Sequence, residues 1–218
     1  MVVKSAVSAR ITTICVHSLR YNTLLMERDR WDERYSAPDR KSLTEPNALV
    51  VEELAQTPPG RAVELAAGEG RHALWLASRG WQIVAVDFSE VALRAAQARA
   101  RTNGHHASFV AADVHTFPLH RARFDLVLAT FFHPRPSERP ALYPRLADAL
   151  APGGTLLLVS YDKANLAEGN KGPQDPDFLM DPPVLAAELR ELGLHVTRAE
   201  AVRVPEAVNA VIRAQRPA

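Results

Sequence analysis

The chain has 218 residues, of which 47% are hydrophobic and 23% charged, and its formal net charge is +1. This composition is that of one globular domain. The near-neutral net charge does not indicate nucleic-acid binding, and no apolar run reaches the length of a membrane span. The single cysteine, Cys15, excludes an intramolecular disulfide and indicates a cytoplasmic protein.

Residues 1–25 differ in composition from the rest of the chain. They contain Lys4, Arg10 and Arg20 but no acid, and they lack the sustained apolar segment of a secretory signal. We expect a disordered tail or an over-extended start ahead of Met26, and a single domain over residues 26–218.

Apolar runs and helical registers alternate through the remainder of the chain. Helices are expected over residues 44–56, 71–78, 90–101, 137–150 and 182–192. Strands are expected over residues 62–66, 82–86, 107–111, 124–130, 155–160, 194–203 and 207–214. The alternation predicts a parallel sheet covered on both faces, but the last two strands are joined by a turn too short for a crossover. The predicted fold class is therefore α/β, a Rossmann-like three-layer sandwich with a seven-stranded, mostly parallel sheet and one reversed strand.

The strongest functional signal is the turn between the strand expected over residues 62–66 and the helix expected over residues 71–78. Glu64 to Arg71 reads Glu-Leu-Ala-Ala-Gly-Glu-Gly-Arg, and Asp87 ends the following strand. Gly68 and Gly70 allow the backbone to approach a ligand, and an acid at the end of the second strand can accept hydrogen bonds from ribose hydroxyls. The two parts together predict a nucleotide-type cofactor. The alternative is a tight strand-to-helix turn that binds nothing.

The reversed strand and the acid-x-x-x-Gly-x-Gly spacing from Glu64 to Gly70 resemble class I S-adenosylmethionine-dependent methyltransferases. The resemblance implies S-adenosyl-L-methionine as cofactor, S-adenosyl-L-homocysteine as product, and a small-molecule methyl acceptor. The cofactor-binding residues that it implies within the domain are Glu64, Ala66, Gly68, Gly70, Arg71, Asp87, Phe88, Ser89, Asp113, Val114, Thr130 and Phe132.

Within that set, the resemblance assigns Asp87 to the ribose, Phe88 and Val114 to the adenine ring, and Asp113 to the exocyclic amine. Ordinary structural roles are open for two of these acids. Asp87 also favours the start of a helix that Ser89 can cap, and Asp113 also suits an Asx turn.

Two further segments resemble bacterial methyltransferases of the tellurite-resistance and thiopurine groups. The first is Trp31-Asp32-Glu33-Arg34-Tyr35, where the resemblance implies that Arg34 pairs with the methionine carboxylate and that Trp31 or Tyr35 faces the sulfonium. An amphipathic packing helix is the alternative. The second is the loop over residues 171–177, a candidate substrate lid. Residues 203–210 depart from the tellurite-type pattern near the last strand.

His133 follows the strand that ends at Thr130, where the resemblance places the transferred methyl group. It is the candidate catalytic residue, either orienting the acceptor or taking its proton, and a loop-capping histidine is the alternative. Amino N-methyltransferases of nucleic acids carry an Asn-Pro-Pro-aromatic motif after this strand, and its absence here weighs against a nucleobase acceptor. The spacing of the histidines predicts no metal site.

Two other functions compete with methyl transfer: an NAD-dependent oxidoreductase, and a non-catalytic regulatory protein that binds S-adenosylmethionine. The expected partner is a small molecule, without nucleic acid or membrane, and the expected assembly is a monomer or a homodimer.

Overall fold

The computed structural model describes residues 11–13, 21–169 and 171–218. Its helices are α1 (Tyr21–Ser36), α2 (Ala48–Leu54), α3 (Arg71–Ser78), α4 (Glu90–Asn103), α5 (Arg139–Ala149), α6 (Asn165–Glu168), the 3-10 turn η1 (Pro176–Phe178) and α7 (Pro182–Glu191). Its strands are β1 (Ile11–Thr13), β2 (Arg61–Leu65), β3 (Gln82–Asp87), β4 (Ser108–Ala111), β5 (Phe124–Thr130), β6 (Leu150–Tyr161), β7 (His195–Val204) and β8 (Ala207–Gln215).

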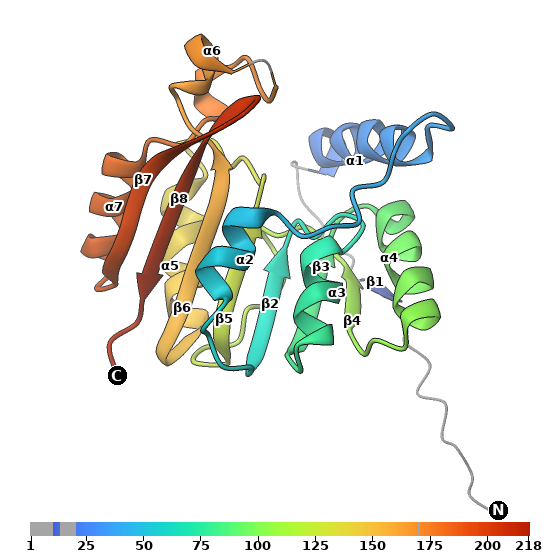
Figure 1. The fold of residues 1–218 in the computed structure, drawn as a ribbon, viewed down its shortest axis with the longest axis horizontal. Coiled ribbons are helices and arrows are strands. Elements are labelled where there is room, and N and C mark those ends of the chain that lie inside the picture. The colour runs from blue at the N-terminus through green and yellow to red at the C-terminus, as the bar shows by residue number, and fades with distance from the viewer. Residues whose placement is uncertain (1–10, 14–20, 170) are drawn as a thin grey trace, which may run out of the picture.

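All eight strands form one sheet in the order β1-β4-β3-β2-β5-β6-β8-β7 (Figure 1). Neighbouring strands from β1 to β6 are parallel, and β8 runs antiparallel to both β6 and β7. The predicted α/β fold with one reversed strand is confirmed, and so is the antiparallel pairing of the last two strands.

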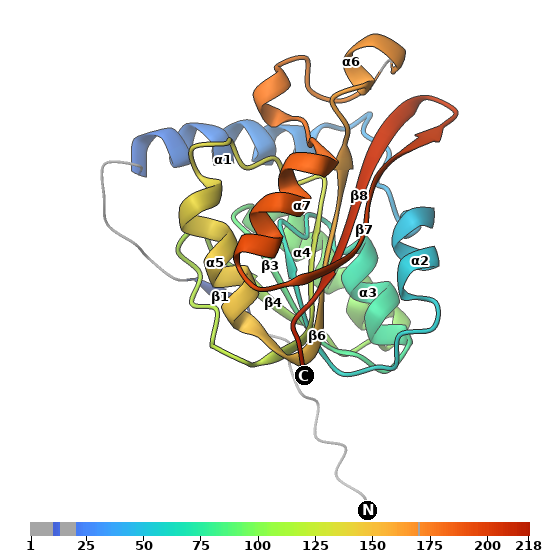
Figure 2. The same ribbon diagram turned by 90° about the vertical axis from the view of Figure 1, so that its left-hand side faces the viewer.

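Figure 2 shows α5 and α7 on one side of the sheet and α2 and α3 on the other, and a separate hydrophobic core lies on each face. One core packs Leu142 and Leu146 of α5 and Leu185 of α7 against the strands. The other packs α2, α3 and α4 against the opposite face, with Leu54 and Leu76 fully buried. This is the three-layer arrangement expected for a sheet whose strands are apolar on both faces.

The order of the strands determines where a ligand can bind. The chain proceeds from β2 through β3 to β4 on one side and from β5 through β6 on the other, so the strand order reverses between β2 and β5. Open parallel sheets bind ligands at such a reversal, beyond the carboxyl ends of the strands. We call this side of the sheet the carboxyl edge. Figures 1 and 2 show α1 and the α6 region lying across it.

Two elements begin four or more residues from their expected starts, and one helix was not the primary expectation. α2 begins at Ala48 and not at Thr44, because Asn47 is the cap and its Oδ1 accepts from the Leu49 amide at 2.9 Å. β6 begins at Leu150 and not at Thr155. The Gly153–Gly154 segment, where a turn ahead of the strand was expected, is part of the strand, and the pairing with β5 shifts register there. The helix α1 was expected only as an alternative for the Trp31 cluster.

The first 25 residues also differ in part from the expected disordered tail. Ile11–Thr13 pair in parallel with β4, and α1 begins at Tyr21, ahead of the expected boundary at Met26. The remainder of this segment, including Cys15, lies outside the described residues, so the domain boundary stays a prediction. None of the helices in the described ranges combines the length and apolar character that a membrane crossing needs.

Candidate functional site

The glycine-rich turn joins β2 to α3 at the carboxyl edge. Ala66, Gly68 and Gly70 all have positive φ angles, of 54°, 54° and 72°. Such angles are strained for alanine, and strained backbone persists where surrounding structure holds it, which is common at binding sites. The turn is therefore a fixed cradle of backbone beside the carboxyl end of β2.

The two glycines have different neighbours, although sequence analysis assigned both to the cofactor. A Cβ on Gly68 would lie 2.8 Å from the hydroxyl oxygen of Tyr35 in α1. A Cβ on Gly70 would lie 3.0 Å from the Cβ of Ala96 in α4. Gly68 thus faces the carboxyl edge, whereas Gly70 allows the close packing of the turn on α4.

Asp87 joins the end of β3 to the glycine turn. It is buried, with one carboxylate oxygen accepting from the Gly68 amide at 2.7 Å and the other from the Ser89 amide at 2.8 Å. Burial raises the pKa of Asp87 to about 6, and the two amide hydrogen bonds act in the opposite direction. Each oxygen keeps one lone pair unused by these bonds, so the carboxylate can still accept from two ligand hydroxyls.

Ser89 and Phe88 follow Asp87 directly. The Ser89 hydroxyl donates to the carboxylate of Asp32 in α1 and accepts from the Ala92 amide at 3.1 Å. Its predicted role as the cap of α4 is confirmed, and its hydroxyl is already committed to these two contacts. Phe88 is half-buried beside it.

Only one member of the Trp31–Tyr35 cluster faces the glycine turn. Tyr35 lies against Gly68, and its pKa is raised by burial first and by the negative charge of Asp87 second. Trp31 and Arg34 are exposed, with the Arg34 guanidinium 4.8 Å from the centre of the Trp31 ring. The structure therefore brings Tyr35 against the turn, while Trp31, whose ring centre lies 5.7 Å from that of Tyr35, and Arg34 lie farther out.

The segment after α1 contains contacts that sequence analysis did not identify. Arg40 pairs with Glu69 of the glycine turn at 2.7 Å and stacks 4.5 Å from the centre of the Tyr35 ring. The Ser42 hydroxyl donates to the other Glu69 oxygen at 2.7 Å. These contacts fasten the segment over the turn. The only signal in the sequence was the presence of the acid Glu69 between the two glycines.

Glu64 and His72 form a fully buried pair beneath the turn. Each side chain is 1% exposed, and Glu64 Oε1 lies 2.8 Å from His72 Nδ1. The hydroxyl of Thr130, at the end of β5, lies 3.2 Å from the same nitrogen. The predicted residues Glu64 and Thr130 therefore meet through a histidine that sequence analysis did not select.

The loop after β4 is fixed by hydrogen bonds from its own Asx turn and from a side chain of α5. Asp113 Oδ1 accepts from the His115 amide at 2.9 Å, which is the Asx turn considered as an alternative. Arg145 of α5 donates to the carbonyl oxygens of Val114, His115 and Phe117. The loop thus has a fixed backbone, and the second oxygen of the half-buried Asp113 carboxylate is outside that turn.

A row of basic and aromatic side chains runs from the start of α3 to the carboxyl ends of β5 and β6. The Arg71 guanidinium lies 5.4 Å from the centre of the Phe131 ring, and the Phe131 and Tyr161 ring centres are 5.2 Å apart. Phe131 has a φ of 52°, a strained angle for a bulky residue. Burial lowers the pKa of Arg71, and it has no ion-pair partner within the described residues. This guanidinium is therefore available to an anionic group.

His133 extends the same row of side chains. Its ring stacks on Tyr161 with centres 6.0 Å apart, and Nδ1 lies 2.8 Å from the carbonyl oxygen of Phe178 and 3.1 Å from the Ser160 hydroxyl. A carbonyl oxygen only accepts, so Nδ1 carries a proton. Burial lowers the pKa of His133, which favours the neutral ring with a lone pair on Nε2. The contact with Phe178 is the loop-capping alternative, and it leaves Nε2 available.

The segment between β6 and α7, which includes the candidate lid over residues 171–177, contacts Tyr161 through Gly172 and His133 through the Phe178 carbonyl. A Cβ on Gly172 would lie 2.8 Å from the Tyr161 ring. Asn165 anchors the segment, because its amide group donates to the Lys171 carbonyl at 2.5 Å and accepts from the Val208 amide at 2.8 Å. Phe132 points elsewhere, with its ring 5.9 Å from that of His115.

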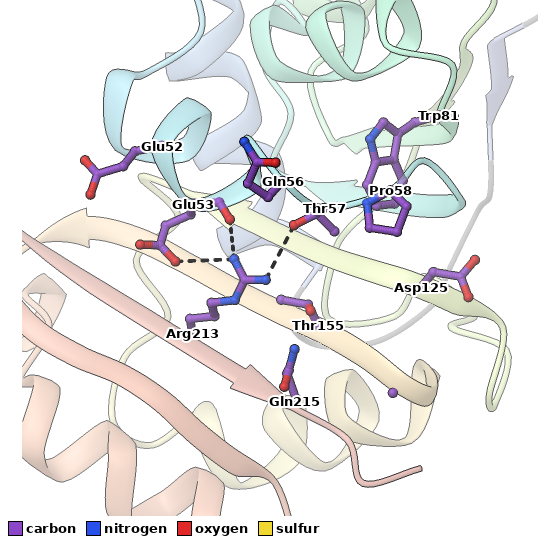
Figure 3. A pocket seen from close by; sticks show the side chains of 11 residues that line it. Glu52, Glu53, Gln56, Thr57, Pro58, Trp81, Asp125, Thr155, Arg213 and Gln215 are labelled. Carbon is purple, nitrogen blue, oxygen red and sulfur yellow. Dashed lines mark hydrogen bonds and ion pairs between the residues drawn. The ribbon is translucent and has the colours of Figure 1, made fainter.

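A hollow of about 510 Å³ lies away from the carboxyl edge, between α2 and the strands β5, β6 and β8 (Figure 3). Arg213 crosses it and pairs with Glu53 at 3.4 Å and with Thr57 at 3.4 Å. Arg198 pairs with the same Glu53. These charged side chains form ion pairs with one another, and none of the candidate site residues lines the hollow. We therefore assign a structural role to the charged residues around it.

Residues 62–154 match the family model described as a methyltransferase domain. The 2-heptyl-1-hydroxyquinolin-4(1H)-one methyltransferase of Mycobacteroides abscessus is 31% identical over 136 residues, which are 61% of this chain and 56% of that protein. The chain thus matches little more than half of the length of this relative.

Solved structures show the same fold at low sequence identity. The 1,6-didemethyltoxoflavin-N1-methyltransferase of Burkholderia thailandensis, solved with 1,6-didemethyltoxoflavin and S-adenosylhomocysteine bound, has a TM-score of 0.67 at 20% identity, covering 94% of this chain and 92% of its own. TehB of Haemophilus influenzae has a TM-score of 0.65 at 14% identity, covering 87% of this chain and 67% of its own. The second score is no higher than the first, so the expected likeness to the tellurite-resistance group is not specifically favoured.

Proposed function

We propose that this chain, a class I S-adenosylmethionine-dependent methyltransferase in fold and matched by a methyltransferase-domain family over residues 62–154, transfers a methyl group to a small molecule. The observation that carries the proposal is Asp87, a buried carboxylate bound to the Gly68 amide at the carboxyl edge. It is the arrangement that a ribose beside a close backbone turn requires.

The residues present suit S-adenosylmethionine. Asp87 keeps lone pairs for two ribose hydroxyls, and the turn at Gly68 has no room for a side chain. Glu64 has one buried oxygen that finds no partner among the described residues. When bound, S-adenosylmethionine supplies a methyl group already activated on a sulfonium. The protein then contributes chiefly alignment, which is worth about 7–11 kcal/mol for well-oriented reactants.

The positions of other side chains support further assignments within this proposal. Asp113 and Val114 hold the adenine from the fixed loop after β4. Arg71 is half-buried and free of ion pairs within the described residues, so it suits the methionine carboxylate better than the exposed Arg34 does. Tyr35 covers the turn from α1.

His133 acts on the acceptor. Its Nε2 lone pair takes the proton of an acceptor hydroxyl or amine, while Nδ1 stays bound to the Phe178 carbonyl. Phe131 and Tyr161 supply ring faces for a planar acceptor. Because the M. abscessus relative is named for a 1-hydroxyquinolone, hydroxylated aromatic heterocycles are the first acceptors to screen. A tellurite-type acceptor is a lower priority.

The competing functions make different predictions. Dinucleotide-binding domains continue with a crossover to a parallel strand, whereas this sheet ends in the antiparallel β7–β8 pair, which disfavours an NAD-dependent oxidoreductase. A regulatory protein would bind S-adenosylmethionine without turnover. A cytoplasmic location and a monomeric or homodimeric state complete the proposal.

The test is calorimetric titration of the full chain with S-adenosylmethionine, S-adenosylhomocysteine and NAD. We expect micromolar affinity for the first two, weakened at least about tenfold by Asp87→Ala, because charge-assisted hydrogen bonds to the ribose are lost. The exposed Asp148→Ala is the matched control and should bind as the wild type does. Binding of NAD alone would overturn the proposal.

A further inference from the structure

The buried Glu64–His72 pair has a defined proton arrangement. The backbone amide of Asn47 donates to His72 Nε2 at 3.2 Å, so Nε2 presents a lone pair and not a proton. A neutral histidine then carries its proton on Nδ1, which lies 2.8 Å from Glu64 Oε1. His72 is thus a donor to Glu64, and the tautomer is set by the chain just ahead of α2.

The second oxygen of Glu64 is left without a partner. Oε2 is buried and accepts no hydrogen bond within the described residues. A buried carboxylate that is only half satisfied is costly, since an unpaired buried charged acceptor loses its hydration without replacement. Such an atom in a native structure calls for an explanation, and a ligand cation supplies one.

We propose that His72 is a positioning residue that holds Glu64 so that its free oxygen, Oε2, receives the ammonium group of the cofactor's amino-acid end. The inference rests on the proposed function. Glu64 lies one residue before the end of β2, next to the strand-order reversal and below the glycine turn, and Arg71 lies close enough to interact electrostatically with it. A carboxylate there with one donor on Oε1 is oriented by that donor.

The arrangement also joins the site to the segment that covers it. Asn47 caps α2 at the end of the stretch that Arg40 and Ser42 fasten to Glu69. When that stretch lies over the turn, the Asn47 amide reaches His72 and selects the tautomer that donates to Glu64. The segment over the turn and the carboxylate of Glu64 are therefore linked through one imidazole ring.

The test separates the two ring nitrogens. Asparagine places an N–H donor near the position of Nδ1, whereas glutamine places its polar atoms near Nε2. We expect His72→Asn to keep the affinity for S-adenosylhomocysteine within about threefold, and His72→Gln and His72→Leu to weaken it at least about tenfold, the usual effect of removing a hydrogen bond to a charged group. The exposed His106→Gln is the matched control.

A second ligand distinguishes positioning from a general loss of structure. 5′-Methylthioadenosine has the adenosine but no amino-acid end, so its affinity should be unchanged in all three variants. The double variant Glu64→Gln/His72→Gln should bind S-adenosylhomocysteine no more weakly than Glu64→Gln alone, since His72 acts through Glu64. Equal weakening for both ligands, or additive effects, would overturn the inference.

The wild-type protein offers a test that needs no variant. Long-range ¹⁵N–¹H spectra distinguish the two histidine tautomers, and His72 is expected to carry its proton on Nδ1. A proton on Nε2 would overturn the inference even if every variant failed to fold. If the wild type bound S-adenosylhomocysteine and the variants His72→Gln and His72→Leu bound it equally well, the inference alone would fail. Binding of neither ligand would overturn the proposed function and this inference with it.

Discussion

Asp87 shows how burial and hydrogen bonding compete at a single residue. Its carboxylate has lost most of its hydration, which raises its pKa to about 6, and two backbone amides recover only part of the loss. A raised carboxylate pKa means that folding favours the protonated form. The stabilisation is complete below the unfolded value of 3.8 and is lost as the pH rises through about 6.

Ligand binding should depend on pH in the opposite sense. Ribose hydroxyls donate to the ionised carboxylate, so we expect S-adenosylhomocysteine to bind about tenfold more weakly at pH 5 than at pH 7.5, since most of Asp87 is protonated one unit below its pKa. Calorimetry across this range measures the change. Asp87→Asn should bind weakly with a flat profile over the same range. An unchanged wild-type affinity would show that Asp87 does not meet the ribose.

At the scale of elements, the loop after β4 depends on a helix far from it in sequence. Arg145 projects from α5 and donates to three carbonyl oxygens of that loop. One guanidinium with several donors can satisfy carbonyls that would otherwise be unpaired. The loop that carries Asp113 is therefore shaped by α5 and not only by its own turn.

We predict that Arg145→Met loosens this loop and weakens binding of S-adenosylhomocysteine and 5′-methylthioadenosine by a similar factor of about threefold to tenfold, because net hydrogen bonds of this kind contribute about 1 kcal/mol each. The equal effect differs from that expected for His72, because both ligands carry adenine. The exposed Arg190→Met should leave both affinities unchanged. An effect on S-adenosylhomocysteine alone would contradict an adenine-side role.

Sequence reasoning succeeded where signals are local and failed where partners are distant. The glycine turn, the acid that ends β3 and the Ser89 cap are local patterns, and the structure forms each of them. His72 and Arg40 gave no such signal, because their partners Glu64 and Glu69 become neighbours only after folding. Sequence analysis treated the Trp31 cluster as one unit, but its members differ in depth: Tyr35 lies against Gly68, whereas Trp31, one helical turn earlier and in ring contact with Tyr35, and Arg34 are exposed.

For the whole molecule, two cores share one sheet. The strands β2, β5 and β6 contribute buried side chains to both clusters, so neither face can lose its packing without affecting the other. This predicts one cooperative unfolding transition for the described domain, as is usual for a domain of this kind.

Leu189 of α7 is fully buried on the face away from α3. We expect Leu189→Ala to lower the free energy of unfolding by about 2–5 kcal/mol through the cavity that it leaves. Val184→Ala on the same helix, where the side chain is 44% exposed, should change it by less than about 0.5 kcal/mol. Denaturant titration followed by fluorescence and circular dichroism would measure both, and two separate transitions would argue against a single unit.

The family match over residues 62–154 includes the glycine turn, Asp87 and the loop after β4, but it stops short of both α1 and the α6 segment that lie across the carboxyl edge. The matched part of the chain thus lies beneath the carboxyl edge, whereas α1 and the α6 segment fall outside the family match. We expect the segments outside the match to vary more between related proteins than the glycine turn does, and the choice of acceptor to vary with them. Proteins that share the part matched over residues 62–154 but differ in the segments across the carboxyl edge are then expected to use the same methyl donor on different acceptors.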